Sequence, residues 1–275
     1  MSNESEDEAG TLSLQVMRED FNRVLMHHIE TTYGQAAYAT ISLLLVGHSM
    51  GGPVAVDAAL HGDPIWTKAV NGIAVIDVVE GSALEALVGM QTMVASRPSS
   101  FTKIDGAIRW AMQSHSVHHL PSAKISVPSQ LVEVKEAVSG QRRFRWRTDL
   151  QKTAPHWEGY LAFSSCWRIH WATEHATGWF KDLSSKFLQV PAAKLLILAN
   201  TDRLDKPLTI AQMQGKFRME IVTDPRGTVG HAVHEDEPEK TAAILIDFAA
   251  MCSAVKRVPM VGGGYKIITM GHTVA

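Results

Sequence analysis

One serine in the sequence has neighbours that are typical of a nucleophile. Residues 47–52 read GHSMGG, which places Ser49 at the centre of a Gly-x-Ser-x-Gly pentapeptide. This motif acts where a strand turns sharply into a helix, because the strained turn leaves the serine hydroxyl exposed. Gly47 and Gly51 are the small residues expected to let neighbouring backbone pass closely. We therefore predict that Ser49 is a catalytic nucleophile and that the peptide N–H of Met50 is an oxyanion donor.

A serine nucleophile needs a general base, which in this kind of site is a histidine. The chain order expected with this motif is serine, then acid, then histidine, which places the base after the last strand. His231 and His234 occupy that position, in the stretch VGHAVHED at residues 229–236. His231 follows a glycine, so a turn can aim its ring back over the sheet, whereas His234 is expected in the next helix. We therefore predict that His231 is the base.

Two aspartates are candidates for the acid that orients this histidine. Asp77 ends an apolar strand that follows the serine motif, and its carboxylate emerges at the same edge of the sheet as Ser49. Asp202 ends a later strand, where most hydrolases with this motif keep their acid. Either residue can hold the imidazole in the required tautomer. Strand position alone slightly favours Asp202.

Three further histidines, His115, His118 and His119, invite comparison with a metal site. No cysteine or carboxylate spacing near them supports one, so we interpret them as a solvated helix face. The glycines at 262–264 lack the strand and helix that flank a nucleotide-binding turn. We expect neither a metal nor a cofactor.

The elements that must position these residues alternate between strands and helices. Apolar residues at helical spacing indicate amphipathic helices, and short apolar runs bounded by turns indicate buried strands. The expected helices cover residues 12–33, 50–60 and 242–251, and the expected strands cover residues 41–46, 72–77, 194–199 and 219–223. Alternation of this kind predicts an α/β fold with a mostly parallel sheet.

The middle of the chain has a different pattern, with short helical stretches and polar loops. We interpret residues 82–190 as a helical cap inserted into the sheet, and the basic run RRFRWR at residues 142–147 lies within it. The chain is then expected to have a disordered acidic N-terminus at 1–11, one α/β domain at 12–252 and a flexible tail at 253–275.

Composition limits the classes of partner and location. The formal net charge is -2, so no basic field draws the chain onto nucleic acid or an anionic membrane. The longest apolar runs are far shorter than the roughly 20 residues that span a bilayer. The two cysteines cannot form a disulfide framework, and the acidic N-terminus lacks the apolar stretch of a signal peptide. These features favour a protein of the cytosol or nucleus.

Four stretches taken together resemble the protein phosphatase methylesterases, a family with the α/β-hydrolase fold. They are GHSMGG at 47–52, IDVVEG at 76–81, TIAQMQGKF at 209–217 and GHAVHED at 230–236, and the resemblance runs from about Leu12 to Phe248. In that family the acid is the aspartate of the IDVVEG stretch, so the resemblance favours Asp77 over Asp202. It also implies the substrate and partner, namely the methyl ester on the C-terminal leucine of the protein phosphatase 2A catalytic subunit.

The sequence departs from that family in two places. Members begin upstream, with the first strands of the sheet and a His-Gly-Gly-Gly-type loop that supplies an oxyanion donor, and this sequence has neither. Losing one such donor costs about 10²–10³ in rate, so the chain is expected to be slow or inactive alone. The strand at 41–46 is expected to leave one sheet edge unpaired and the chain poorly soluble. The second departure is an insertion at 160–177.

Two other functions are compatible with these residues. A chain that docks on the phosphatase through its cap and basic run, without turnover, would be a binding protein. An esterase or amidase that acts on a small molecule would share the serine motif. Labelling of Ser49 by a fluorophosphonate separates an activated nucleophile from a binding protein.

Overall fold

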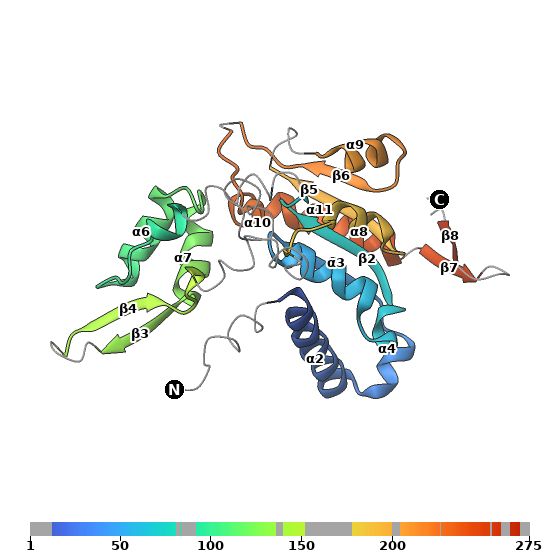
Figure 1. Ribbon diagram of the computed structural model, residues 1–275, viewed down its shortest axis with the longest axis horizontal. Helices are drawn as coiled ribbons and strands as arrows, with labels where there is room; N and C mark the ends of the chain where they lie inside the picture. Colours follow the sequence, from blue (N-terminus) through green and yellow to red (C-terminus); the bar gives the residue numbers. More distant parts are fainter. Residues whose placement is uncertain are drawn as a thin grey trace, which may run out of the picture.

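The computed structural model describes most of the chain (Figure 1). The described residues are 13–80, 83, 92–135, 140–151, 178–199, 204–225 and 227–253, with the backbone of 255–259 and 265–269. The predictions for residues 1–11, for the insertion at 160–177 and for Asp202 lie outside them. Within the described residues, no helix combines the length and the apolar character needed to cross a membrane.

Among the described residues, a parallel sheet of four strands forms the centre of the molecule. The strands are β1 (Leu43–His48), β2 (Val70–Ile76), β5 (Ala193–Leu198) and β6 (Arg218–Ile221), in the order β1-β2-β5-β6. All four predicted strands are confirmed with shifts of one or two residues at their ends. β1 pairs only with β2 among the described strands, so its other edge faces none of them.

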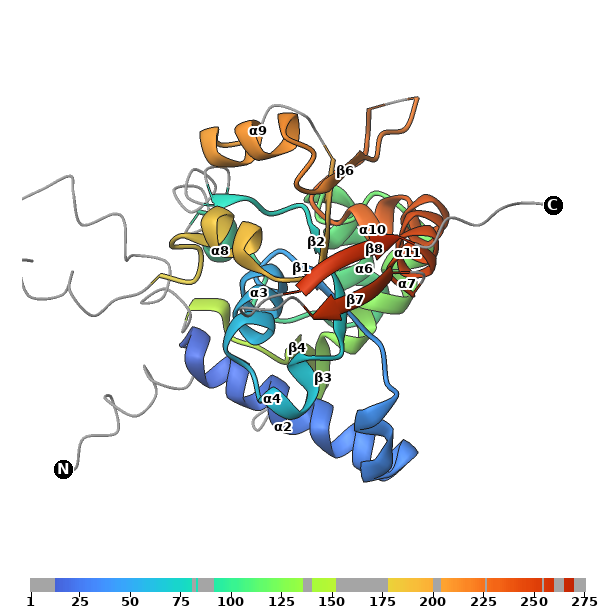
Figure 2. The ribbon, with the colours of Figure 1, turned by 90° about the vertical axis from the view of Figure 1, so that its right-hand side faces the viewer.

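Alternate residues of the strands face two different hydrophobic clusters. On one side Ile73, Val75 and Leu196 pack with α3 (Gly51–His61), α8 (Leu183–Gln189) and α9 (Lys206–Met213). On the other side Ala74 and Ile197 pack against α11 (Pro238–Ser253). Figure 2 shows α3 and α8 on one side of the strands and α11 on the other. Burial on both faces explains why the strands have continuous apolar sequences.

The N-terminal amphipathic helix is confirmed as α2 (Leu14–Tyr33), which packs on α3 rather than on the sheet. Arg18 forms an ion pair with the largely buried Asp57 of α3, at 3.0 Å. Phe21 packs edge to face with Trp66 of α4 (Pro64–Thr67), with ring centroids 5.9 Å apart. An apolar stripe and one buried carboxylate therefore hold α2 in place.

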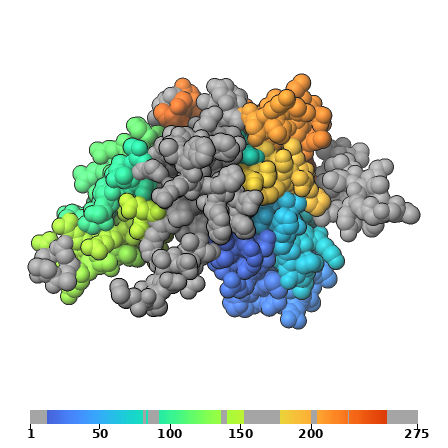
Figure 3. All heavy atoms as spheres, viewed as in Figure 1, coloured from blue at the N-terminus to red at the C-terminus, as the bar shows by residue number. Residues whose placement is uncertain are grey.

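In the residues that the structure describes, the cap has a pair of helices and a hairpin that pack together around a hydrophobic cluster of their own. It comprises α6 (Ile104–Gln113), α7 (Leu120–Ser129), β3 (Leu131–Lys135) and β4 (Arg142–Trp146). Figure 3 shows its green surface at the opposite end of the visible face from the blue α2. At the end of the predicted cap range 82–190, α8 buries Leu183 and Phe187 against the sheet cluster.

Two segments have strands where none was expected. The basic run forms β4, antiparallel to β3, because Phe144 and Trp146 alternate with arginines and pack on the cap cluster. The C-terminal segment, expected to be a flexible tail, contains β7 (Val255–Pro259) and β8 (Tyr265–Thr269), which pair antiparallel. In the basic run, the arginines obscured a period-two pattern.

Candidate active site

Ser49 lies on a strained turn between β1 and α3. Its φ angle is 51°, a left-handed conformation that non-glycine residues rarely adopt. The turn is held because the Ser49 N–H donates to the Ile76 carbonyl at 3.0 Å and the Gly52 N–H donates to the Ser49 carbonyl at 2.8 Å. The hydroxyl is thereby placed at the end of the sheet, beyond the last residue of β1.

Two glycines, Gly47 and Gly52, make this turn possible, whereas the sequence predicted Gly47 and Gly51. A Cβ on Gly47 would lie 2.2 Å from the Gly51 carbonyl oxygen, so Gly47 is required for close backbone approach. A Cβ on Gly51 would meet nothing within 4 Å, and the second crowded position is Gly52, at 2.7 Å from Val78 Cγ1. Gly51 contributes only its backbone to the turn, whereas the lack of a side chain matters at Gly47 and Gly52.

Asp77 stands beside Ser49 because their strands are adjacent and parallel. The register pairs His48 with Ile76, so the residue after each strand emerges at the same point of the sheet edge. The Asp77 side chain is 1% exposed. Its Oδ1 accepts the Ala199 N–H at 3.0 Å, and its own N–H donates to the Ile197 carbonyl at 2.7 Å. The carboxylate is therefore fixed by β5.

His231 joins these two residues. Its Nδ1 lies 2.8 Å from Asp77 Oδ2, and its Nε2 lies 2.8 Å from Ser49 Oγ. The carboxylate can only accept, so Nδ1 carries the proton and Nε2 is free to accept from the serine hydroxyl. The side chain is 55% exposed, so a substrate can approach it from solvent. This is the arrangement that nucleophilic acyl transfer requires.

A family model described as the alpha/beta hydrolase family matches residues 11–244. The chain belongs to the alpha/beta hydrolase family. Two solved structures share the fold, each with a TM-score of 0.53: E-2-(acetamidomethylene)succinate hydrolase, 20% identical over 85% of this chain and 74% of that one, and an M. tuberculosis esterase, 18% identical over 86% and 69%. The predicted fold class is thus confirmed.

Curated relatives of this alpha/beta hydrolase carry the name protein phosphatase methylesterase 1, which confirms the resemblance. The Emericella nidulans protein is 38% identical over 90% of this chain and 55% of its own length. The proteins of Yarrowia lipolytica and Schizosaccharomyces pombe are 39% and 40% identical, over 94% and 86% of this chain and 54% and 59% of their own lengths. The chain therefore spans about half the length of the curated relatives it matches.

Met50 lies between the serine and the first residue of α3, as the N-cap of that helix. Its peptide N–H stands at the positive end of the helix, next to Ser49, where hydrolases of this family place an oxyanion donor. Its side chain is 38% exposed and is not needed for that role. The oxyanion role of Met50 stays a prediction.

His48 is a further residue of this site, and the sequence did not single it out as a candidate. Its Nε2 lies 2.8 Å from the His231 carbonyl oxygen, so Nε2 carries the proton and donates. Its ring centroid lies 4.8 Å from that of His231 and 4.5 Å from that of His234. Burial lowers the pKa of His48 from 6.5 to about 4, so the imidazole is neutral at physiological pH. Its place inside the serine motif is the feature of the sequence that could have identified it.

The remaining histidines are distributed differently from the prediction. His234 lies in α10 (Val233–Asp236), as expected. His115, His118 and His119 do not form a solvated helix face; they lie after α6 and before α7. His118 is three-quarters buried and its Nδ1 lies 3.0 Å from Asp236 Oδ2, while His119 Nδ1 lies 2.9 Å from Ser122 Oγ.

A separate cleft of about 300 Å³ opens beside the cap. Arg97, Arg145 and Trp146 line it, and the Arg97 guanidinium lies 3.9 Å from the centroid of the Trp146 ring. Burial lowers the pKa of Arg97, because partial desolvation disfavours its charge. Ser49, Asp77 and His231 are not among the residues that line this cleft.

Proposed function

We propose that this chain hydrolyses carboxylic esters with Ser49 as nucleophile, His231 as general base and Asp77 as the orienting acid. The observation that carries the proposal is the continuous path from Ser49 Oγ through the imidazole to Asp77, with both steps at 2.8 Å. The buried carboxylate and the strained serine turn support it, because both are typical of an activated nucleophile.

The reaction proceeds in two steps. Ser49 Oγ attacks the ester carbonyl while His231 Nε2 takes the hydroxyl proton, and the tetrahedral oxyanion is stabilised by the Met50 N–H. The carbonyl then reforms, and the alcohol leaves with the proton from His231. In the second step a water molecule gives a proton to His231 Nε2 and attacks the acyl group, and His231 then returns that proton to Ser49 Oγ as it leaves. Asp77 stabilises the imidazolium in both steps.

The substrate we propose is the methyl ester on the C-terminal leucine of the protein phosphatase 2A catalytic subunit, in the cytosol or nucleus. This proposal is supported by the sequence resemblance and by the printed name of the relatives, protein phosphatase methylesterase 1. Methanol would be the leaving alcohol, and the phosphatase would be the protein partner.

Two measurements on the purified chain test this function. A fluorophosphonate probe should label Ser49, and a methylated C-terminal phosphatase peptide should release methanol. Ser49→Ala should abolish both, whereas Ser129→Ala, at an exposed serine of the cap, should change neither. Hydrolysis that persists in a purified Ser49→Ala sample would contradict the mechanism, and labelling without methanol release would favour a small-molecule ester as substrate.

A second candidate function is phosphatase binding without turnover. It is favoured by β4, where Arg142 and Arg145 are exposed, and by the cleft that contains Arg97. In that case the chain would bind the phosphatase with an affinity that decreases with salt, and Ser49 would not react with the probe.

A further inference from the structure

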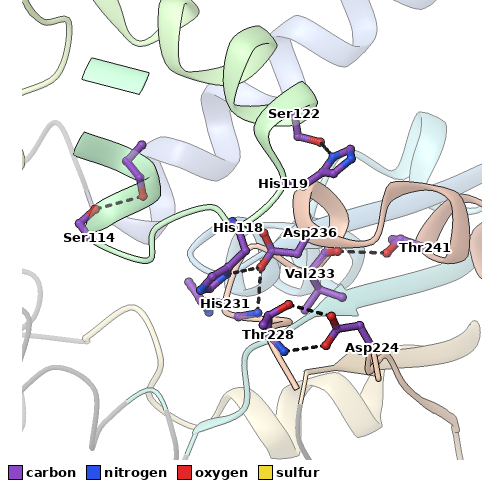
Figure 4. A network of polar contacts seen from close by, with 12 residues as sticks. Ser114, His118, His119, Ser122, Asp224, Thr228, His231, Val233, Asp236 and Thr241 are labelled. Atoms are coloured by element: carbon purple, nitrogen blue, oxygen red, sulfur yellow. Dashed lines mark hydrogen bonds and ion pairs between the residues drawn. The ribbon is translucent and has the colours of Figure 1, made fainter. Parts of the chain in front are cut away.

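The segment that carries His231 lies between two hydrophobic clusters. Ala232 is buried in the cluster of the cap, together with residues of α6 and α7. Val233, the next residue, is buried in the cluster between the sheet and α11. Figure 4 shows His231 and Val233 on this segment, with His118 of the cap alongside. His231 thus directly precedes Ala232 and Val233, between which the chain passes from one cluster to the other.

Asp236, at the end of α10, ties this segment to the cap. Its Oδ2 accepts the Gly230 N–H at 2.8 Å and lies 3.0 Å from His118 Nδ1. Its Oδ1 accepts the His118 N–H at 2.6 Å. The Asp236 side chain is only 3% exposed, so these donors replace the water that a buried carboxylate would otherwise need. One carboxylate therefore joins the residue before His231 to the loop that precedes α7.

Two more contacts make this junction specific. Ser126 of α7 donates to Glu235 Oε2 at 2.6 Å, next to Asp236 in the sequence. A Cβ on Gly230 would lie 2.9 Å from His118 Cε1, so the imidazole of His118 packs directly on the backbone beside His231. The cap and α10 therefore meet through polar and close-packed contacts of the same short segment.

We propose that Asp236 is a positioning residue for His231, and that it sets the place of the catalytic imidazole by anchoring the Gly230 N–H to His118 of the cap. The inference rests on the proposed function for the role of His231 as base. Asp236 does not touch Ser49 or Asp77 in this network; it acts through the backbone on the N-terminal side of His231.

The three donors to Asp236 respond differently to substitution of their acceptor. Two of them, the Gly230 and His118 peptide N–H groups, can only donate, and they bind different oxygens of Asp236. An amide has one acceptor oxygen, so Asp236→Asn leaves one peptide N–H facing an NH₂ group in either orientation. His118→Ala removes only the imidazole donor, and His118→Asn replaces it with an amide N–H.

The test uses the full chain and these three variants, with His119→Ala as matched control. His119 is adjacent to His118, but among the described residues its ring bonds within the start of α7, to Ser122. Turnover of p-nitrophenyl acetate, thermal stability, and the imidazole ¹⁵N and Hδ1 resonances of His231 are measured for each. The resonances report the tautomer and the hydrogen bond to Asp77 without requiring turnover.

We expect Asp236→Asn to lower kcat by about 10- to 100-fold with little change in KM, because a small displacement of a catalytic group has that effect. The Hδ1 resonance should shift or broaden, His118→Ala should give a smaller change of the same kind, and His118→Asn should restore the parent values. His119→Ala should keep the kcat and the His231 resonances of the parent, even if it lowers thermal stability as much as His118→Ala does.

Parent-like His231 resonances in Asp236→Asn, or in His118→Ala if Asp236→Asn does not fold, would overturn the positioning role. A parent chain in which Ser49 neither reacts with the probe nor turns over ester would contradict the proposed function instead. In that event the resonances alone decide whether Asp236 positions His231.

Discussion

The sheet and the cap place the residues of the site by different means. Ser49 and Asp77 each follow a strand, and the ladder between β1 and β2 sets their separation through backbone hydrogen bonds. His231 follows no strand directly, and its segment is held by side chains of both clusters and by Asp236. A backbone ladder tolerates many side chains, whereas the histidine depends on a few particular ones. Substitutions in the sheet and in the cap should therefore have different effects on activity and stability.

The largest effect is expected at Asp77, the proposed acid at the edge of the sheet. In Asp77→Asn the amide oxygen can keep the Ala199 N–H while its NH₂ faces His231 Nδ1, which forces the other tautomer. The Nε2 atom then carries the proton and cannot take one from Ser49, a change that costs about 10⁴ in kcat. Asp202→Asn should stay within a few-fold of the parent, as steady-state kinetics on an activated ester would measure. The reverse pattern would return the acid to Asp202.

The two glycines of the serine turn give a paired test of the sheet side. In Gly47→Ala the new methyl would lie 2.2 Å from a backbone oxygen that cannot move without opening the turn. Overpacking of this kind costs 1–3 kcal/mol in side-chain surroundings, so against backbone we expect about 3 kcal/mol or more. In Gly51→Ala the methyl meets nothing, and alanine in a first helical turn should be neutral or slightly stabilising. Urea unfolding measures both, and equal losses would contradict the account of the turn.

His48 lies where the sheet meets the segment that carries His231. Its expected effect is on how the stability of the fold depends on pH. Its pKa is about 4 in the folded chain, against 6.5 for a free histidine, so on acidification the unfolded state takes up a proton first. The contribution of His48 is therefore fully present above pH 6.5 and is lost as pH falls to about 4, by at most about 3 kcal/mol.

Urea unfolding at several pH values between 7.5 and 4 checks this expectation. His48→Gln keeps an N–H donor and cannot titrate, so its stability should decrease less over that range. His27→Gln, at an exposed histidine of α2, should follow the parent. A parent-like slope in His48→Gln would mean that His48 titrates normally in the folded chain.

The smallest effect is expected inside the cap. Trp146 Nε1 donates to the Pro98 carbonyl at 2.9 Å, and the ring meets Phe101 and Trp110 with centroids 5.5 Å apart in each case. Trp146→Phe removes the donor and keeps an aromatic ring, so we expect a loss of about 1 kcal/mol. Labelling of Ser49 should be unchanged, because the serine turn is built by the sheet. A strong loss of labelling would show that the cap also governs the serine.

The sheet and its serine turn were predictable because several signals agree there. Burial on both faces gives continuous apolar runs such as β2 and β5, and the glycines around Ser49 meet a steric need of the turn. The order of the strands explains why Asp77 reaches His231, but the sequence does not state which strands are neighbours. Strand position alone therefore favoured Asp202, and the family resemblance favoured Asp77.

The cap was harder to predict because its contacts come from distant parts of the chain. Asp236 and His118 meet only in the folded molecule, and nothing in the GHAVHED stretch that contains Asp236 points to His118. In β4 the arginines at alternate positions masked the strand formed around Phe144. His48 was overlooked because its partner is a backbone carbonyl of His231, to which no residue type points.

The burial of Ala232 in the cap cluster has a consequence for making chimeras of such hydrolases. A recombinant that exchanges α6 to β4 with a relative, but keeps its own residues after β6, would bring a foreign surface against Ala232 and a foreign partner to Asp236. The natural unit of exchange is discontinuous, because Gly230, Ala232 and Asp236 contact the cap although they follow the last strand of the sheet. Crossover points chosen from the strand order alone would divide this unit.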